Sequence, residues 1–122
     1  MTLKECYERF GGDYEDVFSR LRTEGRIEKF IVRFLDDDSY DRLCECLASN
    51  DAEGAFRAAH TLKGIAQNFS FTKLFLSAEE ITEALRPGTG DPDADFEALL
   101  ANVTSDYERV RKAIQTYIDE KQ

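Results

Sequence analysis

Residues 93–120 read DADFEALLANVTSDYERVRKAIQTYIDE, and apolar side chains recur along them at alternating intervals of four and three residues. The members of this repeat are Phe96, Leu100, Val103, Tyr107, Val110, Ile114 and Tyr117. Such spacing predicts one long amphipathic α-helix. The stripe could pair two copies of the chain in a coiled coil, but other amphipathic segments of the same chain need a surface on which to pack. We therefore expect a monomer in which this is the longest helix of a bundle.

The rest of the sequence divides into shorter stripes of helical period, and no stretch shows the sustained alternation of a β-strand. The expected helices cover approximately residues 3–10, 14–21, 27–35, 40–49, 52–69 and 72–86. Thr2, Asp13 and Asp51 are suitable N-caps for three of them. Residues 23–25 form a weak joint, and the turn-rich loop 87–92 cannot be crossed by a helix.

The predicted fold class is all-α: an up-and-down four-helix bundle with additional short N-terminal helices. A chain of 122 residues is in the usual size range of one domain. We expect that domain to cover residues 1–122, with the short helices at about 2–22 and the bundle at about 24–120. A content of 42% hydrophobic and 34% charged residues is ordinary for a folded domain and too apolar for a disordered segment.

The charge balance argues against two classes of partner. The formal net charge is −9, from 25 acidic and 16 basic side chains. Nucleic acids and anionic membranes would be repelled by such a surface. No apolar run approaches the roughly 20 residues that cross a bilayer, and residues 1–5 lack the basic-then-apolar order of a signal peptide. We therefore expect a cytoplasmic location.

Three cysteines and a single histidine are the residues most able to bind a transition metal. Cys6, Cys44 and Cys46 do not combine with His60 in any recognised zinc-ligand spacing. We expect reduced thiols, no metal site and no cofactor in this chain.

The side chain of His60 is predicted to project into solvent from the helix at residues 52–69. At about 100° per residue, the apolar positions of this helix lie on the side opposite the histidine. They are Ala55, Ala58, Leu62, Ile65, Ala66 and Phe69. The histidine side instead carries Glu53, Arg57, Lys63, Gly64 and Gln67, with Phe56 as its one large apolar member. A partner should therefore reach the ring, although an idle surface histidine remains the alternative.

Three neighbours suggest a purpose for an accessible ring. Lys63, three residues further on, can bring its ammonium close to the ring or to a group bonded to it, and Arg57 adds a second positive charge. Gly64 costs about 1 kcal/mol relative to alanine inside a helix, so its presence calls for a reason. Glycine has no side chain that would project beside the ring, so another protein's active site could close over His60. A helix end or a tight helix crossing is the alternative reason.

The string Ala59-His60-Thr61-Leu62-Lys63-Gly64 resembles the alanine-histidine-x-leucine-lysine-glycine motif of histidine-containing phosphotransfer (HPt) domains. The helical pattern of nearly the whole chain suits that family's bundle. The resemblance implies that His60 accepts a phosphoryl group, that Lys63 stabilises its charge and that Gly64 gives steric access. One position departs from the family pattern: Ser70 stands where a glycine is frequent, and we expect it to affect the turn into the next helix but not the acceptor.

The same resemblance implies a phosphoryl carrier that acts with a partner. The chain has no glycine-rich phosphate loop, so we expect no ATP site and no independent enzymatic activity. The implied partner is the receiver domain of a response regulator or hybrid sensor kinase, whose aspartate and bound Mg²⁺ complete the transfer. The candidate partner-binding residues are Phe56, Arg57, Gln67 and Leu76. Phe56 could instead border the core, and Gln67 could be an ordinary solvated residue.

Two other functional classes remain as alternatives. A helical adaptor, or a degenerate HPt-like binding module, would use the same bundle without phosphorylating its histidine. A haem or metal four-helix bundle is disfavoured, because the sequence has no Glu-x-x-His pair and its one histidine is expected to face outward.

Overall fold

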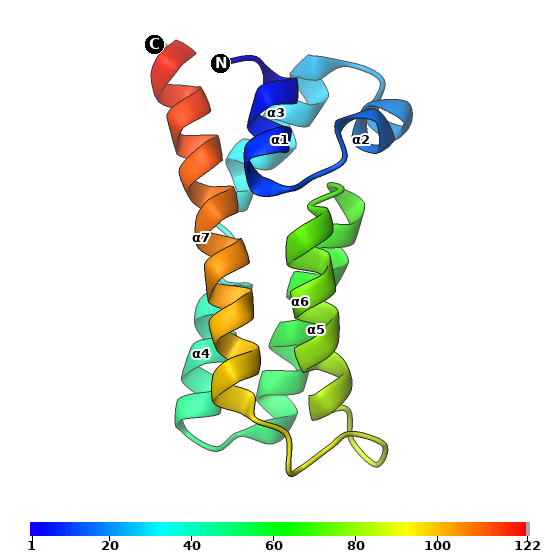
Figure 1. Cartoon of the computed structure of the whole chain (residues 1–122), viewed down its shortest axis with the longest axis vertical. Helices are drawn as coiled ribbons and strands as arrows, with labels where there is room; N and C mark the ends of the chain where they lie inside the picture. Colours follow the sequence, from blue (N-terminus) through cyan, green and yellow to red (C-terminus); the bar gives the residue numbers. More distant parts are fainter. Residues whose placement is uncertain (122) are drawn as a thin grey trace.

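A computed structural model describes residues 1–121 and folds them into seven α-helices (Figure 1). The helices are α1 Leu3–Phe10, α2 Tyr14–Leu21, α3 Glu24–Phe34, α4 Ser39–Ala48, α5 Ala52–Asn68, α6 Thr72–Leu85 and α7 Phe96–Lys121. Residues 1–121 contain no β-strand. The predicted all-α class is therefore confirmed.

Side-chain caps account for several of the helix boundaries. Thr2, Asp13, Thr23 and Asp51 each accept a hydrogen bond from a backbone N–H in the first turn that follows, at 2.9 to 3.2 Å. Such a cap contributes about 1 kcal/mol to helix stability. Arg22 adopts a left-handed conformation with φ of 73°, so the joint before Thr23 is a true break between two helices. Helix α3 consequently begins at Glu24, earlier than its apolar stripe indicates.

Helices α4, α5, α6 and the first half of α7 form the up-and-down four-helix bundle (Figure 1). Helices α1 and α3 lie beside the second half of α7, which runs the length of the molecule, and α2 lies against the turn between α5 and α6 (Figure 1). Tyr40 on α4 stacks on Tyr107 of α7 with ring centroids 4.1 Å apart, and its hydroxyl lies 2.7 Å from that of Thr104. These contacts join the first and last helices of the bundle.

The apolar repeat of α7 faces the interior. Its buried members are Val103, Tyr107, Val110, Ile114 and Tyr117. Phe96 and Leu100, near the start of the helix, are partly buried. Burying a side chain of this size contributes on the order of 1.5–3 kcal/mol to the stability of the fold. The repeat therefore holds both the bundle and the N-terminal helices against α7. The sequence-based assignment of this stripe to intramolecular packing is confirmed.

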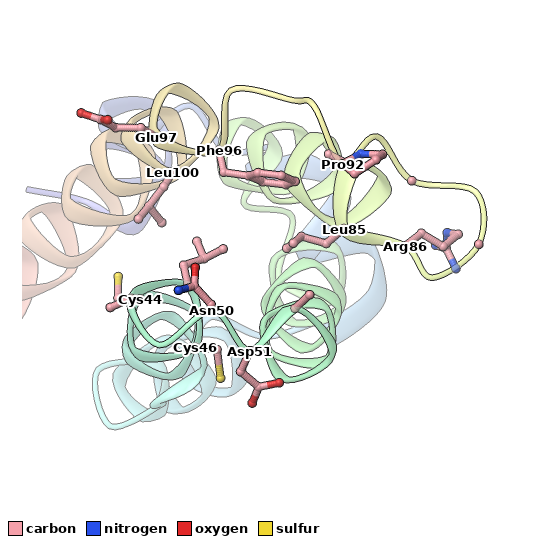
Figure 2. Close-up of a pocket in the computed structure, with 16 residues that line it drawn as sticks. Cys44, Cys46, Asn50, Asp51, Leu85, Arg86, Pro92, Phe96, Glu97 and Leu100 are labelled. Atoms are coloured by element: carbon pink, nitrogen blue, oxygen red, sulfur yellow. The ribbon is translucent and has the colours of Figure 1, made fainter.

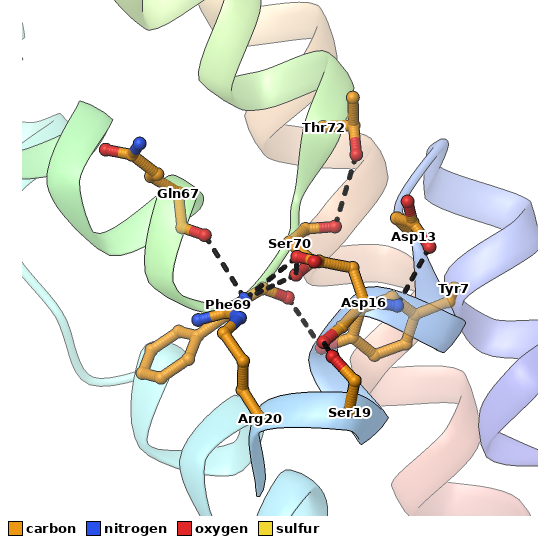
Figure 3. Close-up of polar contacts among 9 residues, drawn as sticks. All are labelled: Tyr7, Asp13, Asp16, Ser19, Arg20, Gln67, Phe69, Ser70 and Thr72. Atoms are coloured by element: carbon orange, nitrogen blue, oxygen red, sulfur yellow. Dashed lines mark hydrogen bonds and ion pairs between the residues drawn. The ribbon is translucent and has the colours of Figure 1, made fainter.

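The turn between α5 and α6 passes through Ser70, which has a left-handed φ of 58° (Figure 3). Its hydroxyl donates a hydrogen bond to Asp16 Oδ2 at 2.6 Å and accepts one from the Arg20 guanidinium at 2.6 Å. Its carbonyl accepts a hydrogen bond from the backbone N–H of Asp13 at 2.9 Å. The bond from Ser70 is also the main cause that lowers the pKa of Asp16. Serine at this position therefore fastens α2 to the turn that ends α5.

Substitutions at Ser70 should separate backbone strain from side-chain bonding. A left-handed conformation costs about 1–2 kcal/mol for a residue with a Cβ and almost nothing for glycine. Ser70→Ala keeps that cost and loses hydrogen bonds worth roughly 1 kcal/mol each. Ser70→Gly loses the same bonds but removes the strain. We expect Ser70→Ala to lower the free energy of unfolding in urea by about 1–2 kcal/mol, and Ser70→Gly to remain close to the parent protein. An alanine variant as stable as the glycine variant would contradict this account.

Candidate functional site

His60 lies in the middle of α5 with its side chain exposed to solvent. The opposite side of the helix packs into the core. Its buried residues include Ala55, Ala58, Leu62 and Ala66. Ile65 and Phe69, at the end of the same stripe, are partly buried. The orientation of the helix, with the imidazole directed away from the core, therefore agrees with the sequence-based prediction.

Phe56 connects the imidazole to the neighbouring helix. Its ring lies edge-on to the ring of His60, with centroids 5.9 Å apart and an interplanar angle of 75°. The guanidinium carbon of Arg86, which immediately follows α6, lies 5.2 Å from the Phe56 centroid. Cation–π contacts of this kind contribute about 0.5–1 kcal/mol at exposed sites. Phe56 is half-buried between these two groups.

Lys63 points toward α6 and lies between two carboxylates. Its Nζ is 3.8 Å from Glu79 Oε2 and 3.9 Å from Glu83 Oε1, and its side chain is 20% exposed. Both separations exceed the usual hydrogen-bond range of about 2.7–3.2 Å for N–H···O. The ammonium is therefore held by charge, without a close directional bond that would have to break before it moved.

Glu83 is the most strongly bonded carboxylate of this cluster. Arg86 donates two hydrogen bonds to it, Nε to Oε2 at 2.9 Å and a terminal nitrogen to Oε1 at 2.8 Å. These bonds are the main reason that the pKa of Glu83 lies below its ordinary value. Lys63 and His60 lower the pKa of Glu83 further, although to a smaller extent. Glu83 is thus an anion within electrostatic range of the imidazole.

The α6 residues of this cluster were not expected from the sequence. The helical pattern of residues 72–86 gave no reason to select Glu79, Glu83 or Arg86, since all three resemble ordinary solvated positions. The two glutamates lie near Lys63, and Arg86 lies over Phe56, because α5 packs antiparallel on α6 (Figure 1). The available signal was the i, i+4 spacing of the two glutamates, which places them on one face but does not identify what that face meets.

Gly64 faces open space. A Cβ built at this position meets no heavy atom within 4 Å beyond its own helix backbone and chain neighbours. Gly64 also lies well inside α5, which continues to Asn68. Neither a helix end nor a tight helix crossing therefore explains the glycine in the described part of the chain.

The remaining predicted partner-binding residues differ in their surroundings. Arg57 is exposed and donates a hydrogen bond to Glu53 at 2.8 Å, one turn earlier on α5. Gln67 is exposed at the end of α5. Leu76, on α6, is 55% exposed and is the most accessible of the large apolar side chains in residues 1–121. All of these residues are open to a partner, but none contacts His60 in the way that Phe56 does.

Arg86 also contributes to the wall of a cavity in the bundle. It measures about 830 Å³ and lies where α4, α5, α6 and α7 meet (Figure 2). Leu47, Leu85, Phe96 and Leu100 contribute to its mainly apolar wall. A large apolar cavity is the default place to look for a small-molecule site, but His60 does not line this one. The candidate chemistry is instead on the surface, where only another macromolecule can enclose it.

The described residues contain no cluster of three or more His, Cys, Asp or Glu side chains placed to hold a metal ion. The three cysteines are free thiols. None of the helices within residues 1–121 has the length and apolar character required to cross a membrane.

The family model of the Hpt domain matches residues 27–119, which include α4 to α6 and most of α7. Neither the search of curated proteins nor the search of solved structures found a significant match. Hpt domains are phosphoryl carriers of two-component phosphorelays, and they interact with receiver domains or kinases. Because the match covers most of its residues, this chain belongs to the Hpt domain family.

Proposed function

We propose that this chain is a phosphorelay intermediate that accepts and donates a phosphoryl group on His60. The observation that carries the proposal is the exposure of the only histidine of an Hpt-family chain, one turn before a glycine with open space around it. An incoming active site can reach the imidazole without displacing any side chain at position 64. The proposed donor and acceptor is the receiver-domain aspartate of a response regulator or hybrid sensor kinase.

The transfer exchanges one bond to phosphorus for another. A neutral imidazole nitrogen of His60 attacks the phosphorus of an aspartyl phosphate, and the P–O bond to the aspartate breaks as the N–P bond forms. The aspartate leaves as a carboxylate with the electron pair of that bond. The reverse reaction restores the P–O bond and returns an electron pair to the imidazole nitrogen. One chain can therefore carry the group in either direction.

The surroundings of His60 support electrostatic assistance by Lys63. A phosphoryl group adds roughly −1.5 to −2 charges at neutral pH, by analogy with phosphoserine. Lys63 is the nearest lysine along α5, and its contacts to Glu79 and Glu83 are long enough to be given up. In this proposal Lys63 turns from the glutamates to the phosphoryl oxygens as the group arrives.

The partner is proposed to supply the metal ion for the transfer. Mg²⁺ is expected to arrive with the receiver domain, where it neutralises the phosphoryl oxygens during transfer. The carboxylates beside Lys63 already bind cationic side chains, which suits a site that receives its metal from outside. Phe56, Arg57, Gln67 and Leu76 are proposed to contact the partner around the acceptor. The proposed state of the free chain is a cytoplasmic monomer.

Replacement of the acceptor tests the proposal. We expect a receiver domain carrying radiolabelled phosphate to label the parent protein but not His60→Gln, because glutamine has no nucleophilic nitrogen of comparable reactivity. A second histidine introduced by Gln115→His, at an exposed position of α7, should not restore labelling in the His60→Gln protein. Circular dichroism checks that each variant keeps its helical content.

The outcomes distinguish a carrier from an adaptor. Labelling that survives His60→Gln would refute the assignment of the acceptor. A receiver domain that binds the parent protein and never labels it would instead indicate a helical adaptor with an unphosphorylated histidine.

Gly64→Ala should raise stability and lower activity. The added Cβ meets no neighbour, so we expect a gain of about 0.5–1 kcal/mol in the free energy of unfolding from better helix propensity. The methyl group should also hinder the approach of the receiver domain and slow transfer by about tenfold or more, since misplacement by 1 Å can cost a hundredfold.

Gly25→Ala is the matched control for this change. Gly25 lies in the first turn of α3 and likewise has no atom within 4 Å of a built Cβ. It should gain stability with unchanged transfer kinetics, as measured by rapid-quench labelling. Equal transfer rates for the two alanine variants would remove Gly64 from the proposed access route.

A further inference from the structure

We propose that Glu83, with Glu79, sets the equilibrium of phosphotransfer by competing with the phosphoryl group on His60 for the ammonium of Lys63. The inference rests on the proposed function and adds a regulation of the same site. The two glutamates are positioning residues: they act through Lys63 and make phosphorylated His60 less stable. The chain then releases the group to the next receiver domain more readily than the histidine and lysine alone would allow.

The four charges of the cluster around Lys63 are balanced before phosphorylation. Lys63 and Arg86 each carry a positive charge, and Glu79 and Glu83 each carry a negative charge. A phosphoryl group adds roughly two further negative charges next to this balanced set. Lys63 cannot fully neutralise the glutamates and the phosphoryl group together. The two anionic groups therefore compete for it.

The geometry places Glu83 at the centre of this competition. Its Oε1 lies 3.9 Å from Lys63 Nζ and also accepts the 2.8 Å hydrogen bond from Arg86. Arg86 in turn lies over the ring of Phe56, which is edge-on to the imidazole. Glu83 consequently interacts with both cations of this cluster, Lys63 and Arg86.

The ion pairs of Glu79 and Glu83 with Lys63 are weak enough to be exchanged for the phosphoryl group and strong enough to have a measurable effect. The side chain of Glu83 is 51% exposed and that of Glu79 is 44% exposed, so solvent screens both interactions. Ion pairs of this exposure change an equilibrium by about 1.5- to 5-fold. An effect of that size adjusts the direction of phosphate flow without preventing transfer.

The experiment measures the transfer equilibrium with the full chain and a phosphorylated receiver domain. We expect Glu83→Gln to raise the ratio of phosphorylated chain to phosphorylated receiver by about 1.5- to 5-fold, because Lys63 and Arg86 become available to the phosphoryl group. Glu79→Gln should raise it in the same direction. Glu80→Gln, at an exposed position of the same helix, is the control and should leave the ratio unchanged.

Further readouts separate competition from a structural effect. Glu83→Asp keeps the charge and should return the ratio toward that of the parent protein. The effect of Glu83→Gln should shrink in the Lys63→Ala protein, and also in about 1 M salt, where the Debye length falls to about 3 Å. An unchanged or lowered ratio in Glu83→Gln, or a full effect in the absence of Lys63, would overturn the inference while leaving the proposed function intact. A parent protein that is never labelled would overturn both.

Discussion

The antiparallel packing of α5 on α6 is the constraint on which the candidate site depends. It buries one side of α5 through small and aliphatic residues, among them Ala59 and Leu62, which are inaccessible to solvent. Because an α-helix has a fixed period, burying that side directs His60 outward. The same packing brings Glu83 close to Lys63 and places Arg86 over the ring of Phe56, which is edge-on to the imidazole. Orientation of the acceptor and the charge around it therefore have a single physical origin.

The N-terminal helices strengthen this arrangement at one end. Ser70 ends the connection from α5 and is bonded through its hydroxyl to Asp16 and Arg20 of α2. Tyr7 of α1 donates a hydrogen bond to the carbonyl of Phe69 at 2.8 Å (Figure 3). Both contacts hold the turn that sets how α6 lies against α5. The short helices are thus connected to the site through the backbone of this turn.

Much of the fold could be predicted from the sequence because local rules determine it. Helical periodicity located the helices, and residues such as Asp13 and Asp51 fixed where they begin. The exposure of His60 followed from the same periodicity. The break at Arg22 was less clear, since a left-handed arginine leaves no sequence signal. The contacts of Ser70 join residues that are far apart in the sequence, and no local pattern specifies them.

Only the part of the candidate site that lies on α5 could be predicted from the sequence. The residues on α5 share one helix with His60, and their spacing is enough to place them near it. Glu79 and Glu83 belong to another helix, so their relation to Lys63 depends on how far one helix slides along the other. That register is set by core packing, which sequence periodicity does not describe.

The surface position of the acceptor also explains why the imidazole does not line the apolar cavity of the bundle. The apolar cavity among α4, α5, α6 and α7 is suited to a small molecule, whereas an exposed imidazole is suited to an active site that a second protein completes. A carrier needs a reactive nitrogen, room for the partner and a charge balance that neither traps nor expels the phosphoryl group. His60, Gly64 and the cluster around Lys63 match these three needs.

The most direct measurement is NMR of the parent protein, with isotope-labelled histidine, during reaction with a phosphorylated receiver domain. The sequence contains one histidine, so every imidazole nitrogen resonance belongs to His60. The account predicts a new phosphorus resonance coupled to one ring nitrogen, which disappears when an unphosphorylated receiver domain is added in excess. Phosphate that reaches the chain while the imidazole resonances stay unchanged would contradict it.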